Sequence, residues 1–204
     1  MVVKIIFMLT FALLLVPSSV SAFEATLEQD QLVEQGVAFY NDNEFEKAKA
    51  ILLPLAEIGH PKAMNIVGLM HNNTGVFPND PRIACDWYEK AANAGYPSAM
   101  YNMSNCYNDG IGRPKDPETD KHWLLKAADN GYTPAMIILS SLDKSEGEEY
   151  RYWMNMAREH GSVYAKVSLY LQGYAHDVPD LYIQDKVCVY VRIIILGGDK
   201  RVCD

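Results

Sequence analysis

The sequence lacks three features that would define a function directly: a second long apolar run, an excess of basic residues and a coherent catalytic set. Residues 5–16 are apolar apart from Thr10, and the best later run, residues 187–196, is short and contains Arg192. Lys and Arg number 18 against 26 Asp and Glu, which gives a formal net charge of −8. This balance argues against binding to nucleic acid or anionic membranes. It favours a basic partner, or it serves only to keep the protein in solution.

The first 22 residues have the features of a secretory signal peptide. Lys4 precedes the apolar stretch 5–16, Pro17 ends it, and Val20 and Ala22 supply small residues for cleavage before Phe23. The apolar stretch is too short for a ~30 Å hydrocarbon core, which needs about 20 residues. We therefore expect a periplasmic or secreted protein with one mature domain, residues 23–204, and no membrane insertion once the signal is removed.

Cysteine is also scarce, with four residues and no Cys-x-x-Cys pair. In an exported chain such cysteines favour disulfides over metal ligands. The five histidines are scattered, and none pairs with another ligand at i, i+4, so we expect no metal and no cofactor. The cysteines are Cys85, Cys106, Cys188 and Cys203.

What the sequence does contain is an internal repeat, the feature to seek before any motif. Four glycines follow one another at steps of 36, 36 and 30 residues, each has an alanine four residues later, and a tryptophan stands eight residues before the last three. The glycines are Gly59, Gly95, Gly131 and Gly161, the alanines Ala63, Ala99, Ala135 and Ala165, and the tryptophans Trp87, Trp123 and Trp153.

The pattern predicts two helices in each unit. The second helix ends at the glycine, which suits the left-handed position after a helix. We expect first helices at about 61–71, 97–108, 133–142 and 163–172, and second helices at about 80–94, 116–130, 146–160 and 180–196. The alanines, with Gly68, Ser104 and Ser140 five residues later, predict close helix contacts. The tryptophans predict buried core residues.

The units resemble Sel-one-like repeats, a tetratricopeptide variant with a longer inter-helix loop. The matching residues are Ala99, Tyr107, 109–112, Asp116, Trp123, 126–128 and Gly131, and before them Ala63, Gly68, 75–76, Asp80, 87–88, 90–92 and Gly95.

The resemblance covers roughly residues 60–198 and is specific for fold but not for function. It implies an all-α, right-handed solenoid of about five antiparallel helix pairs, an exported protein of bacterial type and a binding role rather than catalysis. The expected units are 26–59, 60–95, 96–131, 132–161 and 162–198, with a tail at 199–204. The fourth unit lacks the glycine loop, and the fifth lacks tryptophan, which indicates a cap.

Stacking of such units predicts which cysteines pair. Cys85 lies near the start of one second helix and Cys106 near the end of the next first helix, which favours a bridge between them. Cys188 and Cys203 would pair if the tail folds back along the last helix. Reduced, buried cysteines are the alternative.

Two short motifs suggest enzymes. Residues 109–112 resemble a glycine-rich phosphate loop, but the preceding strand and the following Lys-Ser/Thr are missing. Ser141 and Lys144 have the Ser-x-x-Lys spacing of penicillin-recognising enzymes, without the partner motifs of those enzymes. We therefore expect no catalytic residues, with a β-lactamase-like activity as the remote alternative.

Solenoids bind partners on the concave face lined by first helices. We expect that face to include positions two and six residues after each repeat alanine. Three functions remain open: an immunity or inhibitor protein that neutralises an antibacterial effector, an envelope adaptor for secretion, motility or host interaction, and a penicillin-recognising enzyme. The predicted partner-binding residues are Asn65, Leu69, Tyr101, Asn105, Ile137, Ser141, Val167 and Leu171.

Overall fold

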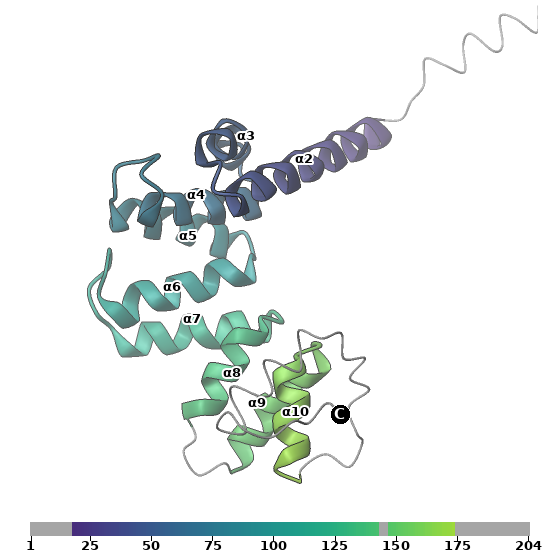
Figure 1. Ribbon diagram of the computed structural model, residues 1–204, viewed down its shortest axis with the longest axis vertical. Coiled ribbons are helices and arrows are strands. Elements are labelled where there is room, and N and C mark those ends of the chain that lie inside the picture. Colours follow the sequence, from purple (N-terminus) through teal and green to yellow (C-terminus); the bar gives the residue numbers. More distant parts are fainter. Residues whose placement is uncertain (1–17, 143–146, 174–204) are drawn as a thin grey trace, which may run out of the picture. The chain divides into compact units, whose positions relative to one another are not determined.

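The computed structural model describes residues 18–142 and 147–173, and the regular elements in these ranges are all α-helices (Figure 1). None of these helices has the length and apolar character needed to cross a membrane. The chain divides into two compact units, one up to Leu139 and one from Ser140 onward. The helices are α2 (Ser18–Asn41), α3 (Phe45–Glu57), α4 (Pro61–Asn73), α5 (Pro81–Asn93), α6 (Pro97–Asp109), α7 (Pro117–Asp129), α8 (Thr133–Leu142), α9 (Glu148–Glu159) and α10 (Val163–Leu171).

The helix pairs follow the predicted repeat. Helices α4 to α10 match the expected ranges to within two residues at each end, and α2 with α3 forms the expected opening pair. The all-α repeat fold is thus confirmed. The expected helix at 180–196, the tail and most of the expected signal peptide lie outside the described residues, so the signal and the domain bounds stay predictions.

Proline and glycine set the ends of these helices. Helices α4, α5, α6 and α7 each begin with proline, which suits the first turn because its missing N–H needs no partner there. At the end of α5, Gly95 has φ of +86° and the N–H of Tyr96 donates to the carbonyl of Ala91 at 3.0 Å. The same turn follows α3, α7 and α9, so all four repeat glycines have the predicted left-handed conformation.

Small residues let the helices of the first unit pack closely. Ala63 and Ala99 are fully buried, as predicted. Gly68 of α4 lies against the ring of Tyr88 of α5, and a Cβ at this glycine would come within 2.5 Å of the ring. Successive helices from α2 to α7 pack on one another, and Figure 1 shows α4, α5, α6 and α7 as consecutive layers. The repeat spacing therefore produces one continuous core through this unit.

The tryptophans correct one prediction. Trp153 is buried, but Trp87 and Trp123 are only partly buried. A lysine three residues later covers each of these two rings, with Lys90 Nζ 4.4 Å from the ring centre of Trp87 and Lys126 Nζ 4.6 Å from that of Trp123. Neighbouring positions, Tyr88 and Leu124, supply the buried side chains instead, so the repeat tryptophan lies at the margin of the core.

In the second unit, α9 and α10 pack as a helix pair. Trp153, Met154, Ala165 and Leu169 are buried. The hydroxyls of Tyr150 and Ser168 lie 3.1 Å apart and join the two helices. This contact between the second helix of one repeat and the first helix of the next corresponds to that of α5 with α6 in the first unit.

Candidate protein-binding cleft

A cleft of about 290 Å³ lies in the first unit, where one repeat meets the next. Its walls come from the end of α4 and the loop after it, the start of α5, one face of α6 and the loop after α6. Four of its nine lining residues are asparagines, and we refer to it below as the asparagine cleft. The lining residues are Asn72, Asn79, Pro81, Cys85, Asn102, Asn105, Cys106, Asp109 and Ile111.

Helix α6 contributes one continuous polar stripe to the asparagine cleft. Asn102, Asn105 and Asp109 are spaced by three and four residues, which places them on one helix face. The side-chain nitrogen of Asn102 donates to Oδ1 of Asn65 at 2.8 Å, which fixes it against the preceding repeat. Within the described part of the chain, the Asn105 amide has no hydrogen-bond partner. Asn105 is therefore available to a ligand.

Helix α4 and its loop form the opposite wall. The side-chain nitrogen of Asn72 donates to the hydroxyl of Tyr88 at 3.1 Å. Burial raises the pKa of Tyr88 well above its usual value, and the nearby Tyr40 adds to this effect, so the hydroxyl stays neutral. When its amide is oriented to satisfy both atoms, the Asn79 nitrogen donates to the carbonyls of His71 at 3.2 Å and Asn72 at 3.0 Å. These bonds hold both amides in place.

A second hollow, of about 320 Å³, shares Asn72 and Asn79 with the asparagine cleft. In it the ring of His71 stacks on the ring of Phe77, with centroids 4.2 Å apart. Lys49 Nζ lies 4.4 Å from the centre of the Phe77 ring. Burial lowers the pKa of His71 despite the opposing influence of a hydrogen bond to Pro78 and the charge of Asp80. His71 Nδ1 is buried and lacks a hydrogen-bond partner among the described residues.

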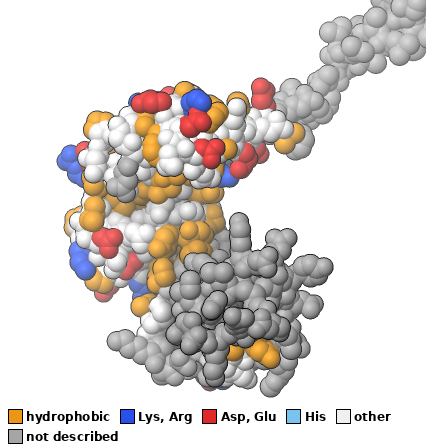
Figure 2. Space-filling model, viewed as in Figure 1, with side chains coloured by type: hydrophobic (Ala, Val, Ile, Leu, Met, Phe, Trp, Pro, Cys, Tyr) orange, Lys and Arg blue, Asp and Glu red, His pale blue; other side chains and the backbone are white. Residues whose placement is uncertain are grey.

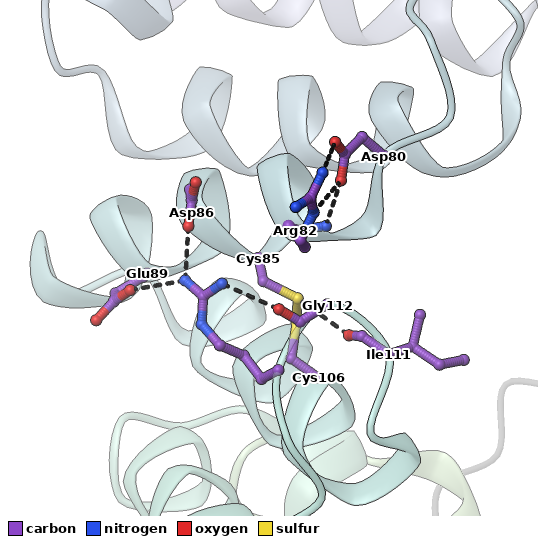
Figure 3. A network of polar contacts seen from close by, with 9 residues as sticks. Asp80, Arg82, Cys85, Asp86, Glu89, Cys106, Ile111 and Gly112 are labelled. Atoms are coloured by element: carbon purple, nitrogen blue, oxygen red, sulfur yellow. Dashed lines mark hydrogen bonds and ion pairs between the residues drawn. A yellow bond between two sulfur atoms is a disulfide. The ribbon is translucent and has the colours of Figure 1, made fainter.

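A disulfide and an ion-pair cluster hold the far rim of the asparagine cleft (Figure 3). Cys85 and Cys106 are bonded, with Cα atoms 6.3 Å apart, so the pairing predicted from the repeat is confirmed. The carbonyl oxygen of Ile111 lies 3.4 Å from Cys85 Sγ. Cys188 and Cys203 lie outside the described residues.

Arg113 ties the same loop to the preceding repeat. Its guanidinium donates to Asp86 at 2.7 Å, to Glu89 at 3.0 Å and to the carbonyl of Gly112 at 3.1 Å. Gly112 packs so tightly that a Cβ would lie 2.4 Å from the carbonyl oxygen of Pro81. The rim is therefore preformed.

The charge of the asparagine cleft comes from a single lining residue, Asp109. Asp109 is the last residue of α6, where the helix dipole is negative. On the face seen in Figure 2, apolar side chains gather over the middle of the first unit, and charged side chains lie mostly towards its edges. The cleft thus offers amide groups and one carboxylate rather than a basic surface.

Of the eight predicted partner-binding residues, the structure places one, Asn105, in this cleft. Asn65 and Val167 are buried, at 2% and 7% exposure, so their prediction as surface residues is wrong. Leu69, Tyr101 and Ile137 are half-buried, and Ser141 and Leu171 are exposed. Tyr101 packs on Tyr132, with ring centroids 5.4 Å apart, rather than towards the cleft.

Sequence reasoning missed Asn72, Asn79, Asn102 and Asp109. The spacing of residues 102, 105 and 109 by three and four positions could have identified them as one polar face of a helix. The predicted binding face contained Tyr101 instead, one residue before Asn102. Lys144, the second residue of the Ser-x-x-Lys motif, lies outside the described residues. In residues 18–142 and 147–173, no three His, Cys, Asp or Glu side chains are grouped so that they could hold a metal ion.

Comparisons with known proteins agree with the repeat geometry. The Sel1 repeat family model matches residues 61–96 and 97–132. The crystal structure of a Sel1 repeat protein from Oxalobacter formigenes is similar, with 29% identity and a TM-score of 0.59 over 69% of this chain and 61% of that protein.

A second similar structure is c5321, described as a protective antigen present in uropathogenic Escherichia coli strains and displaying an SLR fold. It is 25% identical, with a TM-score of 0.57, over 76% of this chain and 36% of that protein. The chain therefore spans less than two thirds of either relative. No curated protein gave a significant match. The Sel-one-like resemblance is confirmed: residues 61–132 contain two Sel1 repeats, and the repeat fold of the chain is similar to the folds of these Sel1-repeat structures.

Proposed function

We propose that this chain is exported and captures a protein partner through the asparagine cleft. The observation that supports this most is the unpartnered amide of Asn105 in a preformed hollow between two Sel1 repeats. Buried or half-buried amides that lack an internal partner gain most from a ligand that completes their hydrogen bonds. Because a disulfide and an ion-pair cluster already order the rim, binding there costs little conformational entropy.

Export is supported by two independent features. Residues 1–22 have the sequence features of a signal peptide. The Cys85–Cys106 disulfide joins two successive repeats, and disulfides persist in oxidising compartments such as the periplasm. We propose a periplasmic or secreted location on these grounds.

Within this function we favour the role of an immunity protein. A small, acidic, exported binding module suits the inhibition of a basic antibacterial effector delivered by a rival cell, because opposite charge speeds association. An envelope adaptor would use the same cleft for a partner of the host cell's own secretion or motility machinery.

The first experiment tests capture. The tagged full chain, oxidised, is used as bait against envelope extracts and extracts of co-cultured rival cells, beside its Asn105→Ala and Asn93→Ala variants. Asn93 is the matched control because it is an exposed asparagine at the end of α5, outside the cleft lining. We expect one partner to be retained by the parent and by Asn93→Ala and lost with Asn105→Ala. Equal retention by all three would exclude the cleft.

The second experiment tests location and role. Fractionation of cells that express the C-terminally tagged chain should place it in the periplasm or medium, shortened by the signal. Full-length protein confined to the cytoplasm would contradict export. Deletion of the gene should reduce survival in co-culture with effector-producing rivals; a secretion or motility defect instead would identify the adaptor role.

A further inference from the structure

We infer that the asparagine cleft takes an extended peptide segment of the partner that carries a basic side chain, bound beside Asp109. This inference rests on the proposed function and names the chemistry of the segment. Three properties of the cleft support it: an excess of hydrogen-bond acceptors, a single negative charge and an apolar strip along the rim.

The acceptor excess arises from the internal hydrogen bonds of the asparagines. Asn72 and Asn102 each donate one side-chain N–H to a neighbouring side chain, and Asn79 donates both of its N–H groups to backbone carbonyls. Within the described residues, the side-chain oxygens of Asn72, Asn102 and Asn105 accept no hydrogen bond. An Asn oxygen can accept two hydrogen bonds, so the lining retains more acceptors than donors.

A ligand rich in donors matches such a lining. The backbone of an extended segment presents N–H groups at regular intervals, and Asn105 can pair with a whole peptide group because both halves of its amide are free. A lysine ammonium or arginine guanidinium adds three or more donors without adding an acceptor. A carboxylate would find no cation in the lining and would be repelled by Asp109.

The charge argument points the same way. Asp109 supplies the charge of the lining, and the carbonyl end of α6 adds a partial negative charge beside it. The chain as a whole carries a formal net charge of −8, which attracts basic segments over longer distances. Charge complementarity therefore favours lysine or arginine at the Asp109 end of the cleft.

The rim has room for the stem of such a side chain. Pro81, the disulfide of Cys85 and Cys106, and Ile111 line the same cleft, and Ile111 is 56% exposed. Lysine and arginine commonly lay their methylene groups along an apolar surface while the charged head reaches a polar partner. The apolar strip next to Asp109 offers that arrangement.

The test is a selection from a displayed library of random decapeptides on the oxidised full chain. The same selection is run on Asp109→Asn and on Asp129→Asn, the matched control, since Asp129 is the last residue of α7 and is exposed outside the cleft. We expect lysine or arginine at one peptide position to be enriched at least fivefold over the input library. The enrichment should vanish with Asp109→Asn and persist with Asp129→Asn.

Three results would overturn the inference: selection of acidic or carboxylate-terminated peptides, selection of basic peptides that ignores Asp109, or no selection at all. Capture of a folded partner that depends on Asn105, together with any of these results, would leave the proposed function intact and remove only the extended basic segment. Loss of both would remove the cleft as a binding site.

Discussion

The two Sel1 repeats have inter-helix loops of the same length, residues 74–80 and 110–116, that are held in different ways. The first is held by noncovalent contacts: Lys49 Nζ donates to the carbonyl of Val76 at 3.2 Å, Thr74 donates to the carbonyl of Met70 at 2.8 Å, and Phe77 stacks on His71. The second is held by Arg113 and by packing against the Cys85–Cys106 disulfide, which joins α5 to α6.

This difference shows that the repeat determines where the helices lie, whereas the contacts that hold each loop differ from one repeat to the next. Both loops begin after a 13-residue helix and end at an aspartate cap followed by proline, Asp80 in one and Asp116 in the other. Yet the first loop depends on a titratable ring, and the second on a bond that a reductant can break. The two walls of the asparagine cleft should therefore respond to different conditions.

The largest expected effect comes from removing the covalent anchor. Replacing both Cys85 and Cys106 with alanine should lower the free energy of unfolding by about 3 kcal/mol, because the bridge closes a loop of 21 residues in the unfolded chain. Urea denaturation of the oxidised parent and the double variant measures this. Reductant should shift the parent to the variant's midpoint and leave the variant unchanged; a parent insensitive to reductant would contradict the covalent anchor.

A pair of glycines compares the packing of the two loops. Gly112→Ala should destabilise the protein by about 2.5 kcal/mol, because the new Cβ adds a clash with the Pro81 carbonyl to the strain of a positive φ. Gly75→Ala should cost only about 1 kcal/mol, since its φ is also positive but the added Cβ meets open space. Thermal unfolding of both variants checks the difference, and equal losses would show that backbone strain alone decides.

The ion pairs of the second loop should matter less. Arg113→Ala should cost about 1 kcal/mol, since Asp86 and Glu89 are roughly half exposed and water screens both pairs. Arg82→Ala is the control because the Arg82 side chain is largely exposed and pairs with Asp80, two residues away. We expect no measurable change there in chemical denaturation. A larger loss for Arg82 than for Arg113 would refute the role assigned to the rim cluster.

The smallest effect is a pH dependence of the first loop. Burial lowers the pKa of His71 below its ordinary value near 6.5, so the unfolded chain binds a proton more readily than the folded chain. Stability should therefore fall as the pH drops below about 6.5, with Lys49 opposing protonation and Asp80 favouring it. His71→Phe should reduce the loss of melting temperature between pH 7 and pH 5.

The control for this titration is His122→Phe, because His122 is exposed on α7. It should keep the parent's pH dependence. If His71→Phe and the parent lose the same stability on acidification, the buried ring of His71 does not couple the first loop to pH.

The sequence predicted the features that recur in each repeat and missed those that occur in one repeat only. The glycine and alanine registers located the helices, the left-handed turns and the Cys85–Cys106 pair, because these depend on packing that recurs in each unit. The asparagine cleft depends on residues outside that register. Asn79 has Lys115 as its counterpart one repeat later, and Asn102 has Ile66 one repeat earlier.

The failed surface predictions have a similar cause. Asn65 was placed on the surface by counting from the repeat alanine, but it lies in the contact between two repeats, where it accepts a hydrogen bond from Asn102. One residue corresponds to a rotation of about 100° on a helix, so a small error in phase exchanges a partner-facing position for a buried one. Side-chain contacts between repeats settle that phase, and one unit's sequence does not contain them.

The disulfide also determines how this array would behave under tension. A stack of helix pairs pulled from its ends unravels and extends by about 3.3–3.6 Å for every residue released. The Cys85–Cys106 bond would carry the force directly between α5 and α6. The segment between the two cysteines, with a sequence separation of 21, would therefore contribute nothing to the extension. About 70 Å of chain length would stay hidden until a reductant released it.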